Sequence, residues 1–167
     1  TISLKGNFTD SRSIDMIDAD GSTLAFTGTS PQTFSSAFAS GESFNDVVVN
    51  NAAGVSFTTG NMRITGSGSL ACQNGILNTG ASKVILNSTA TITETTTSYV
   101  LGNVESERTL TNASNNFGGM GLAIAAAGAE PGLTTVTRNT GNSTNVGCSN
   151  SSILRSFTVT PAVNTGL

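Results

Sequence analysis

The chain has 167 residues, which is enough for one domain, or for one domain and a small second one. Only 10% of its residues are charged, against about 25% in ordinary soluble domains. Ser, Thr, Asn and Gly replace the missing charges, and such a polar, nearly uncharged surface is typical of an extracellular protein. The net charge is −3, and grouped basic residues and long apolar runs are both absent. Nucleic acid is therefore excluded as a partner, and so is a membrane span, which needs about 20 apolar residues.

Short β-branched runs, bounded by Gly and Asn, predict strands throughout residues 1–110. Gly, Thr and Ser interrupt every window before a helical period can establish itself. Turn residues such as Asn50-Asn51 and Asn74-Gly75 separate the runs. The centres of the predicted strands are Phe26, Phe34, Val49, Phe57, Ile64, Cys72, Leu77, Ile85, Ile92 and Val100.

A longer period of 21 to 22 residues overlies these strands. It aligns 54–56 with 75–77 at an offset of 21 and, at an offset of 22, Ile64 with Leu86 and Leu70 with Ile92. A three-sided β-solenoid requires three short strands per period, because each coil buries its apolar side only by stacking on the next. Alternation alone also fits a β-sandwich of antiparallel hairpins, but the offset favours the solenoid. We therefore expect an all-β chain in which residues 1–110 form a right-handed, three-sided parallel β-solenoid.

Alternation within the predicted strands assigns one face to the core. The residues expected to point inward are Leu24, Phe26, Val47, Val49, Val55, Phe57, Ile64, Leu70, Ile85 and Ile92.

Residues 111–167 are expected to form a small β-rich, sandwich-like segment. The stretch Thr109–Gly119 is polar and shows no strand pattern after Leu110, so it predicts a linker. Gly128 and Pro131 prevent the alanine-rich run before them from forming a helix. So small a segment has a thin core of its own, and we expect it to dock on the last coil. Strands are predicted at 122–126, 134–138 and 153–160.

Several phrases of the sequence resemble large surface proteins of the Bacteroidetes. Gly21–Phe34 is similar to their recurrent "GTLTFNGTGAQTF", and Phe44–Phe57 is similar to "FNNLTVNNASGVTL". Gly75–Gly80 resembles "GVLNTG", and Tyr99–Leu110 contains a likeness to "YVNGNVTRTL". The parts that resemble the β-rich module that follows in those proteins are 122–141 and 153–167.

The resemblance implies a module of a long polypeptide exported by the type IX secretion system. Such proteins are adhesins, gliding-associated surface proteins or polysaccharide-active multidomain proteins. Their C-terminal sorting domain is missing here, and the ending at Leu167 resembles an internal cut, so the second segment is expected to be truncated. The family supplies no agreed catalytic residues.

The two cysteines, Cys72 and Cys148, allow two interpretations. In an exported protein they invite a disulfide, which would contribute about 4 kcal/mol in the chain-entropy model. Alternatively, Cys72 fills a core position, since alternation from Leu70 places it on the inward side. The sequence has no His and no paired-Cys spacing, which argues against a transition-metal site.

Asp15, Asp18 and Asp20, followed by Gly21, form the one acidic cluster of the sequence. Their oxygens are candidate ligands for Ca²⁺, although the spacing misses the EF-hand pattern. The competing interpretation is that residues 18–21 are a tight turn built from turn-forming Asp and Gly. No other cofactor is expected.

Glu105 and Glu107 alternate on one predicted strand and share a face, as the paired carboxylates of glycoside hydrolysis must. The chain has no Trp and a single Tyr on which a sugar ring could stack. We therefore predict surface salt bridges with Arg108 or Arg63, and we predict that the chain is not an enzyme. Thr91 and Thr93 have no Thr equivalents one period earlier, which argues against an ice-binding face.

The sequence thus predicts a structural or adhesive module of a large secreted or cell-surface protein. Its expected partners are other surface polypeptide modules or glycans. One alternative is a carbohydrate-binding accessory module of a secreted polysaccharide-active protein. Another is a self-associating filament unit, because open solenoid ends expose unpaired strand edges.

Overall fold

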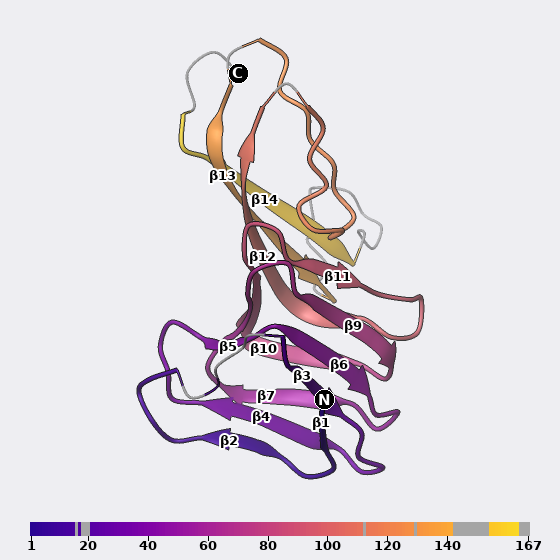
Figure 1. Ribbon diagram of the computed structural model, residues 1–167. Helices are drawn as coiled ribbons and strands as arrows, with labels where there is room; N and C mark the ends of the chain where they lie inside the picture. Colours follow the sequence, from indigo (N-terminus) through magenta and orange to yellow (C-terminus); the bar gives the residue numbers. More distant parts are fainter. Residues whose placement is uncertain (16, 18–20, 112, 129, 142–153, 164–167) are drawn as a thin grey trace.

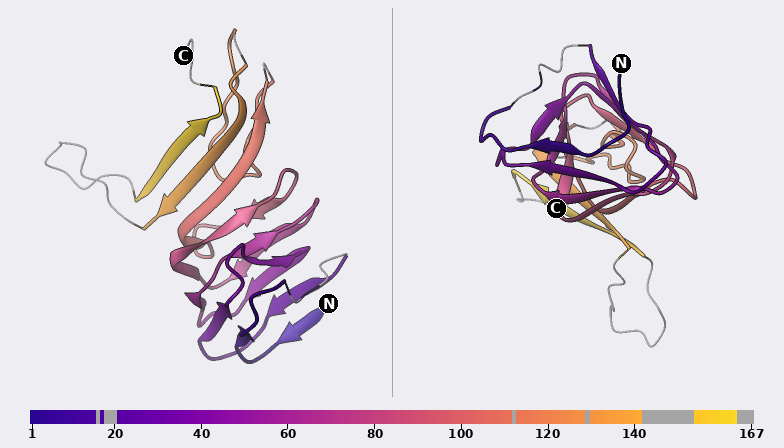
Figure 2. Two further views of the ribbon diagram at one scale, coloured as in Figure 1. Left: turned by 90° about the vertical axis from the view of Figure 1, so that its left-hand side faces the viewer. Right: turned by 90° about the horizontal axis from the view of Figure 1, so that it is seen from below.

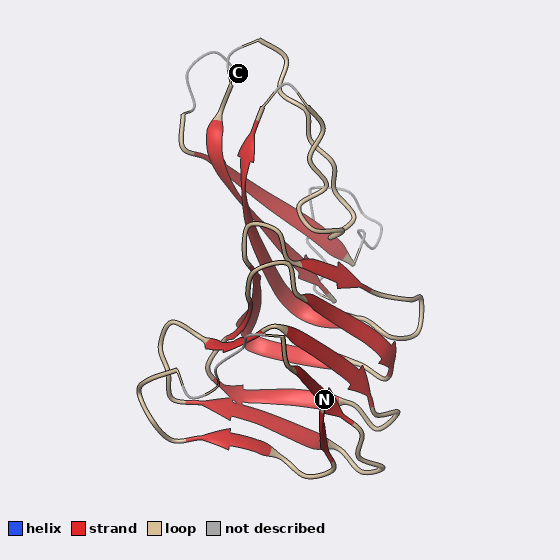
Figure 3. Cartoon of the chain, viewed as in Figure 1, coloured by secondary structure: helices blue, strands red, loops and turns tan. Residues whose placement is uncertain are grey.

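The structure is a computed structural model that describes residues 1–15, 17, 21–111, 113–128, 130–141 and 154–163. These residues form an all-β chain that contains a β-solenoid of about five turns and no helix (Figure 3). The all-β prediction and the solenoid prediction are therefore confirmed. The strands are β1 (Ile2–Leu4), β2 (Phe8–Asp10), β3 (Thr23–Phe26), β4 (Gln32–Ser36), β5 (Glu42–Phe44), β6 (Asp46–Asn50), β7 (Val55–Thr59), β8 (Met62–Ile64), β9 (Ser69–Asn74), β10 (Leu77–Leu86), β11 (Thr91–Thr93), β12 (Val100–Leu110), β13 (Gly132–Thr140) and β14 (Arg155–Pro161).

Parallel ladders run along the stack of coils (Figure 1). One sheet has the order β1-β3-β6-β9-β11. The second sheet contains the ladder β2-β4-β7-β10-β12, and β5 and β8 form a side branch that joins β10. The right-hand view of Figure 2 shows the coils nearly superimposed around a shared interior. Each coil thus repeats the backbone path of the previous one.

The register of these ladders follows the predicted period, with one correction. Ile64 pairs with Leu86 and Leu70 pairs with Ile92, as predicted. Val55 pairs with Leu77, whereas the alignment at an offset of 21 had matched it to Ile76. The offset of 22 therefore already holds at this coil, and it places two inward apolar side chains on top of each other.

The core lies inside the coils, and the predicted inward residues are buried except for Ile85. Val84 and Leu86 are fully buried instead. Because Leu86 occupies the inward position equivalent to Ile64, alternation turns Ile85 to the outer face. A stack of aromatic rings strengthens the interior: Phe34 lies 5.1 Å from Phe8 and 4.6 Å from Phe57 between ring centroids.

Strand β12 connects the solenoid to the C-terminal strands. Its edge toward β10 is parallel, its edge toward β13 is antiparallel, and β14 follows β13 antiparallel. The left-hand view of Figure 2 shows β12, β13 and β14 continuing beyond the coils. Predicted strands 134–138 and 153–160 correspond to β13 and β14, although residue 153 lies outside the described residues. The prediction for 122–126 is wrong, since only an isolated bridge from Ile124 to Asn115 forms there.

The prediction of a linker over Thr109–Gly119 is also wrong. Residues 113–121, here called the C-terminal cap, fold over the last coil and bury the Phe117 and Met120 side chains completely. The backbone N–H of Ile92 donates to the Gly118 carbonyl at 2.8 Å. Gly118 has a φ of 78°, and a Cβ there would lie 2.6 Å from the Ala90 carbonyl oxygen. Only glycine allows so close a contact.

Candidate functional site

Arg108 lies on the inward side of β12, next to the cap, and is buried. Its Nη1 donates to the carbonyl of Asn87 at 2.6 Å, and its Nη2 donates to that of Ala90 at 2.7 Å. Burial lowers the pKa of the guanidinium from its ordinary value. The side chain thus satisfies carbonyls at the end of the stack, and the predicted salt bridge from Arg108 to Glu105 or Glu107 does not form.

A second buried arginine, Arg138 of β13, holds the C-terminal strands to the solenoid. Its guanidinium donates to both carboxylate oxygens of Glu94, at 2.7 and 2.6 Å. Arg155 of β14 reaches the same carboxylate at 3.6 Å. Glu94 also accepts the backbone N–H of Val100 at 2.8 Å. This bidentate pair is a structural clamp between the loop after β11 and strand β13.

The outer face of β12 carries Glu105 and Glu107, which share that face as predicted. Glu105 forms an ion pair with Lys83 at 2.7 Å, and Glu107 accepts the Thr135 hydroxyl at 3.2 Å. Arg63, the other predicted partner, instead donates to the Asn87 side-chain oxygen at 3.0 Å. The ion-pair partner of Glu105 is therefore a lysine one coil below, which the alternation of β10 turns to the same face.

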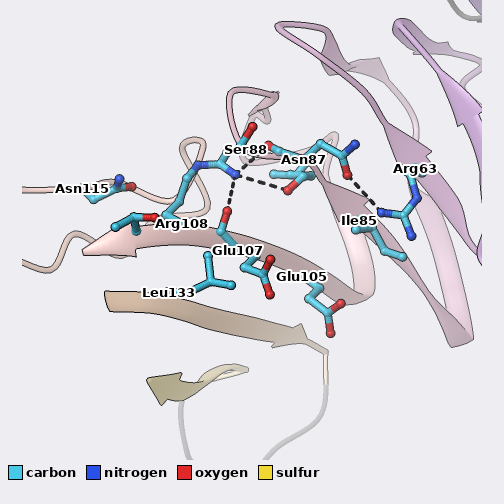
Figure 4. A pocket seen from close by; sticks show the side chains of 11 residues that line it. Arg63, Ile85, Asn87, Ser88, Glu105, Glu107, Arg108, Asn115 and Leu133 are labelled. Atoms are coloured by element: carbon cyan, nitrogen blue, oxygen red, sulfur yellow. Dashed lines mark hydrogen bonds between the residues drawn. The ribbon is translucent and has the colours of Figure 1, made fainter. Parts of the chain in front are cut away.

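A pocket of about 550 Å³ lies on this outer face, where β12 leaves the solenoid (Figure 4). Strands β8, β10, β12 and β13, the turn after β10 and the cap all contribute to its wall. In Figure 4 the Glu107 side chain lies beside Leu133, Glu105 lies farther along β12, and the Arg63 guanidinium lies near Ile85. The outward rotation of Ile85 therefore supplies an apolar part of the wall.

The chemistry of this pocket is hydrogen bonding. Two carboxylates and two guanidinium groups line it, and Asn87, Ser88 and Asn115 add neutral polar groups. Among the described residues, no aromatic side chain and no cysteine lines the pocket. We therefore call it the outer pocket and treat it as the candidate binding site of the chain.

The predicted acidic cluster falls largely outside the described residues, because Asp18 and Asp20 are not among them. Asp15 accepts the backbone N–H of Ser43 at 3.2 Å. In the described ranges, no group of three or more His, Cys, Asp or Glu side chains is placed to hold a metal ion. Calcium binding by Asp15, Asp18 and Asp20 remains a prediction.

Cys72 lies in the core with 2% of its surface exposed, on the side that alternation predicted. Burial, and secondarily the charge of Glu94, raises the pKa of its thiol from 9.0 to about 12, while Arg138 opposes the shift. A thiolate is disfavoured in this position, so Cys72 is a poor nucleophile. Cys148 lies outside the described residues, and the disulfide remains a prediction.

The neighbouring strand β9 has no threonines beside Thr91 and Thr93 of β11, as predicted when an ice-binding face was considered. Thr91 pairs with Ser69, and Thr93 pairs with Ala71.

Sequence reasoning missed the roles of Arg108, Glu94 and Arg138. The alternation of side chains along a strand was the available signal for the two arginines. Arg108 follows Val104 on the inward side of its strand, and Arg138 follows Val136 in the same way. Glu94 follows a strand end and carries no such signal.

Comparison with protein families, with curated proteins and with solved structures yields no match to this chain. Within the described residues, no helix is long and apolar enough to span a membrane.

Proposed function

We propose that this chain is a structural or adhesive module of a large secreted or cell-surface protein, and that it is not an enzyme. The observation that carries the proposal is the continuity of the second sheet. It extends from β2 in the first coil through β12 to β14, without a break between the two predicted segments. A rigid body of this kind is suited to holding neighbouring modules at a fixed distance.

In the proposed architecture the solenoid is right-handed and three-sided, and β12 to β14 belong to a sandwich-like segment. Successive strands such as β6, β7 and β8 join successive ladders, which supports one strand per side in each coil. Each added coil lengthens such a stack by about 4.8 Å. The number of coils therefore sets the spacing that the module imposes.

An extracellular location and export by the type IX system are part of the same proposal. They are supported by the nearly uncharged composition and by the phrases that resemble Bacteroidetes surface proteins. Other surface modules or glycans are the proposed partners. The filament alternative is less well supported, because Arg108 and the cap cover the C-terminal end of the stack. An end closed in this way offers no free coil for the next molecule.

Small-angle X-ray scattering of the purified chain tests the structural role. We expect a monomeric, elongated particle whose scattering fits one rigid body, with the C-terminal strands in line with the stack. Heating should give one cooperative transition, since the clamp and the shared sheet join the two segments. Scattering that requires a hinge between residues 110 and 113, or two separate transitions, would contradict the proposal.

A further inference from the structure

The outer pocket combines charges of both signs without pairing all of them. Glu107 is exposed, and neither it nor Arg63 forms an ion pair with any residue in the described ranges. Arg63 is anchored by hydrogen bonds to the Asn87 side chain and to the Ser40 carbonyl, at 3.0 and 2.8 Å. A fixed donor and an accessible acceptor therefore face the same space.

The balance of charge restricts the class of ligand. Lys83, Arg63 and Arg108 would oppose a cation, and Glu105 and Glu107 would oppose an anion. A neutral hydroxyl avoids both penalties, because it can donate to a carboxylate and accept from a guanidinium. Two hydroxyl groups on adjacent carbon atoms, as in a sugar ring, can donate one hydrogen bond and accept another side by side.

Two apolar side chains of the pocket wall add to its fit for a sugar ring. Leu133 is 49% exposed, and Ile85 is turned outward beside Arg63 (Figure 4). They offer contact to the C–H face of a pyranose ring, while the polar groups engage its edge. The wall holds no aromatic ring, so the interaction is expected to be weak, with a Kd of about 1 mM or higher.

We propose that the outer pocket binds a neutral saccharide, with Glu107 accepting from and Arg63 donating to its hydroxyl groups. This inference rests on the adhesive part of the proposed function, and it assigns the proposed glycan contact to one pocket and to uncharged sugars. It assigns the pocket to binding alone.

The test is a titration of the full-length ¹⁵N-labelled chain, followed by amide NMR shifts, which detect weak binding. The neutral probes are maltotriose, cellotriose and mannotriose. Arginine methyl ester, sulfate and glycine serve as cationic, anionic and zwitterionic probes. We expect at least one trisaccharide to shift amides of residues 105–109, 133 and 87–88 at tens of millimolar or below.

Glu107→Gln removes the charged acceptor and keeps the shape of the side chain. It should weaken binding about tenfold, as the loss of one charge-assisted hydrogen bond requires. Glu130→Gln is the matched control, because it makes the same charge change at an exposed residue outside the pocket, and it should bind like the parent chain.

Three results would overturn the inference: no neutral trisaccharide shifts these amides, a charged probe or glycine shifts them more strongly, or Glu107→Gln binds as well as the parent. Scattering separates this outcome from the structural role. If the particle is rigid but binds no sugar, the proposed structural role still stands and only the saccharide inference fails. If the particle is hinged, the structural role is contradicted, whatever the pocket binds.

Discussion

At the scale of single residues, the buried clamp between Arg138 and Glu94 is the most consequential interaction of the described chain. The Arg138 side chain is 0% exposed and that of Glu94 is 12% exposed. Arg138→Met would leave the Glu94 carboxylate with the Val100 N–H and with the more distant Arg155, at 3.6 Å, as its one cationic partner among the described residues. We expect a loss of about 3–5 kcal/mol in the free energy of unfolding, measured by urea titration.

Lys83→Met provides the comparison for that variant. The Lys83–Glu105 pair lies on the outer face with side chains 35% and 24% exposed, so its loss should cost about 1 kcal/mol or less. Equal costs for the two variants would show that Arg138 does not act as a buried clamp.

Cys72 makes stability depend on alkaline pH. The pKa of its thiol is raised in the folded chain, from 9.0 to about 12, so folding favours the protonated form. The resulting stability is fully present below pH 9 and is lost as the pH rises from 9 toward 12. With reductant present, the unfolding free energy should fall over this range more steeply in the parent than in Cys72→Val. Parallel curves for the two proteins would argue against the raised pKa.

At the scale of elements, the second half of β10 differs from the prediction in which side chain points inward, although its pairing with β8 is the predicted one. Leu86 is fully buried, whereas Ile85 lies on the outer face. Leu86→Ala should therefore cost about 2–5 kcal/mol, and Ile85→Ala about 1 kcal/mol or less. Chemical denaturation of both variants measures the difference. The reverse order would support the original prediction that Ile85 points inward.

The strand pattern of the solenoid could be predicted because two periodicities reinforce each other. Alternation marks the faces of β6 and β7, and the repeat of Leu70 at Ile92 marks the stacking of coils. Ile85 was placed wrongly because Val84, Ile85 and Leu86 are all apolar. Such a run has no visible alternation of its own. The pairing of Ile64 with Leu86, which the 22-residue period already predicted, is what places Leu86 inward and Ile85 outward.

The cap and the outer pocket could not be predicted in the same way. Phe117 and Met120 are the two large apolar residues of a polar, glycine-rich stretch, and the φ of 50° at Phe117 is rare outside glycine. Their burial depends on tertiary contacts with the last coil. The pocket collects residues from strands far apart in the sequence. The shared face of Glu105 and Glu107 and the presence of Arg63 near them could be predicted, whereas Leu133 of β13 could not.

At the scale of the whole molecule, the parallel register predicts that one coil can be removed cleanly. Deleting residues 47–69 joins Asp46 to Leu70. It places β9 on β3 in the position that β6 had held, and β10 takes the places of β7 and β8. We expect a folded monomer that is shorter by about 4.8 Å in scattering, although less stable because a coil of core is lost.

Deleting residues 47–68 instead is the matched control for the coil deletion. It joins Asp46 to Ser69, and the one-residue slip turns the inward side chains of β9 outward. This variant should be unfolded or aggregated by circular dichroism and size-exclusion chromatography. If the two deletions behave alike, the coils are not interchangeable units.

The C-terminal cap also has a consequence for the order in which the chain is made. Arg108 and Phe117 follow every coil in the sequence, so during synthesis or export the coils emerge before the residues that close them. Until then, the newest coil lacks the Arg108 donors that contact the carbonyls of Leu86, Asn87 and Ala90, and its apolar end is uncovered. A chain stalled near residue 100 would thus be a template for aggregation, and the same surface would be covered only once Arg108, Phe117 and Met120 had followed.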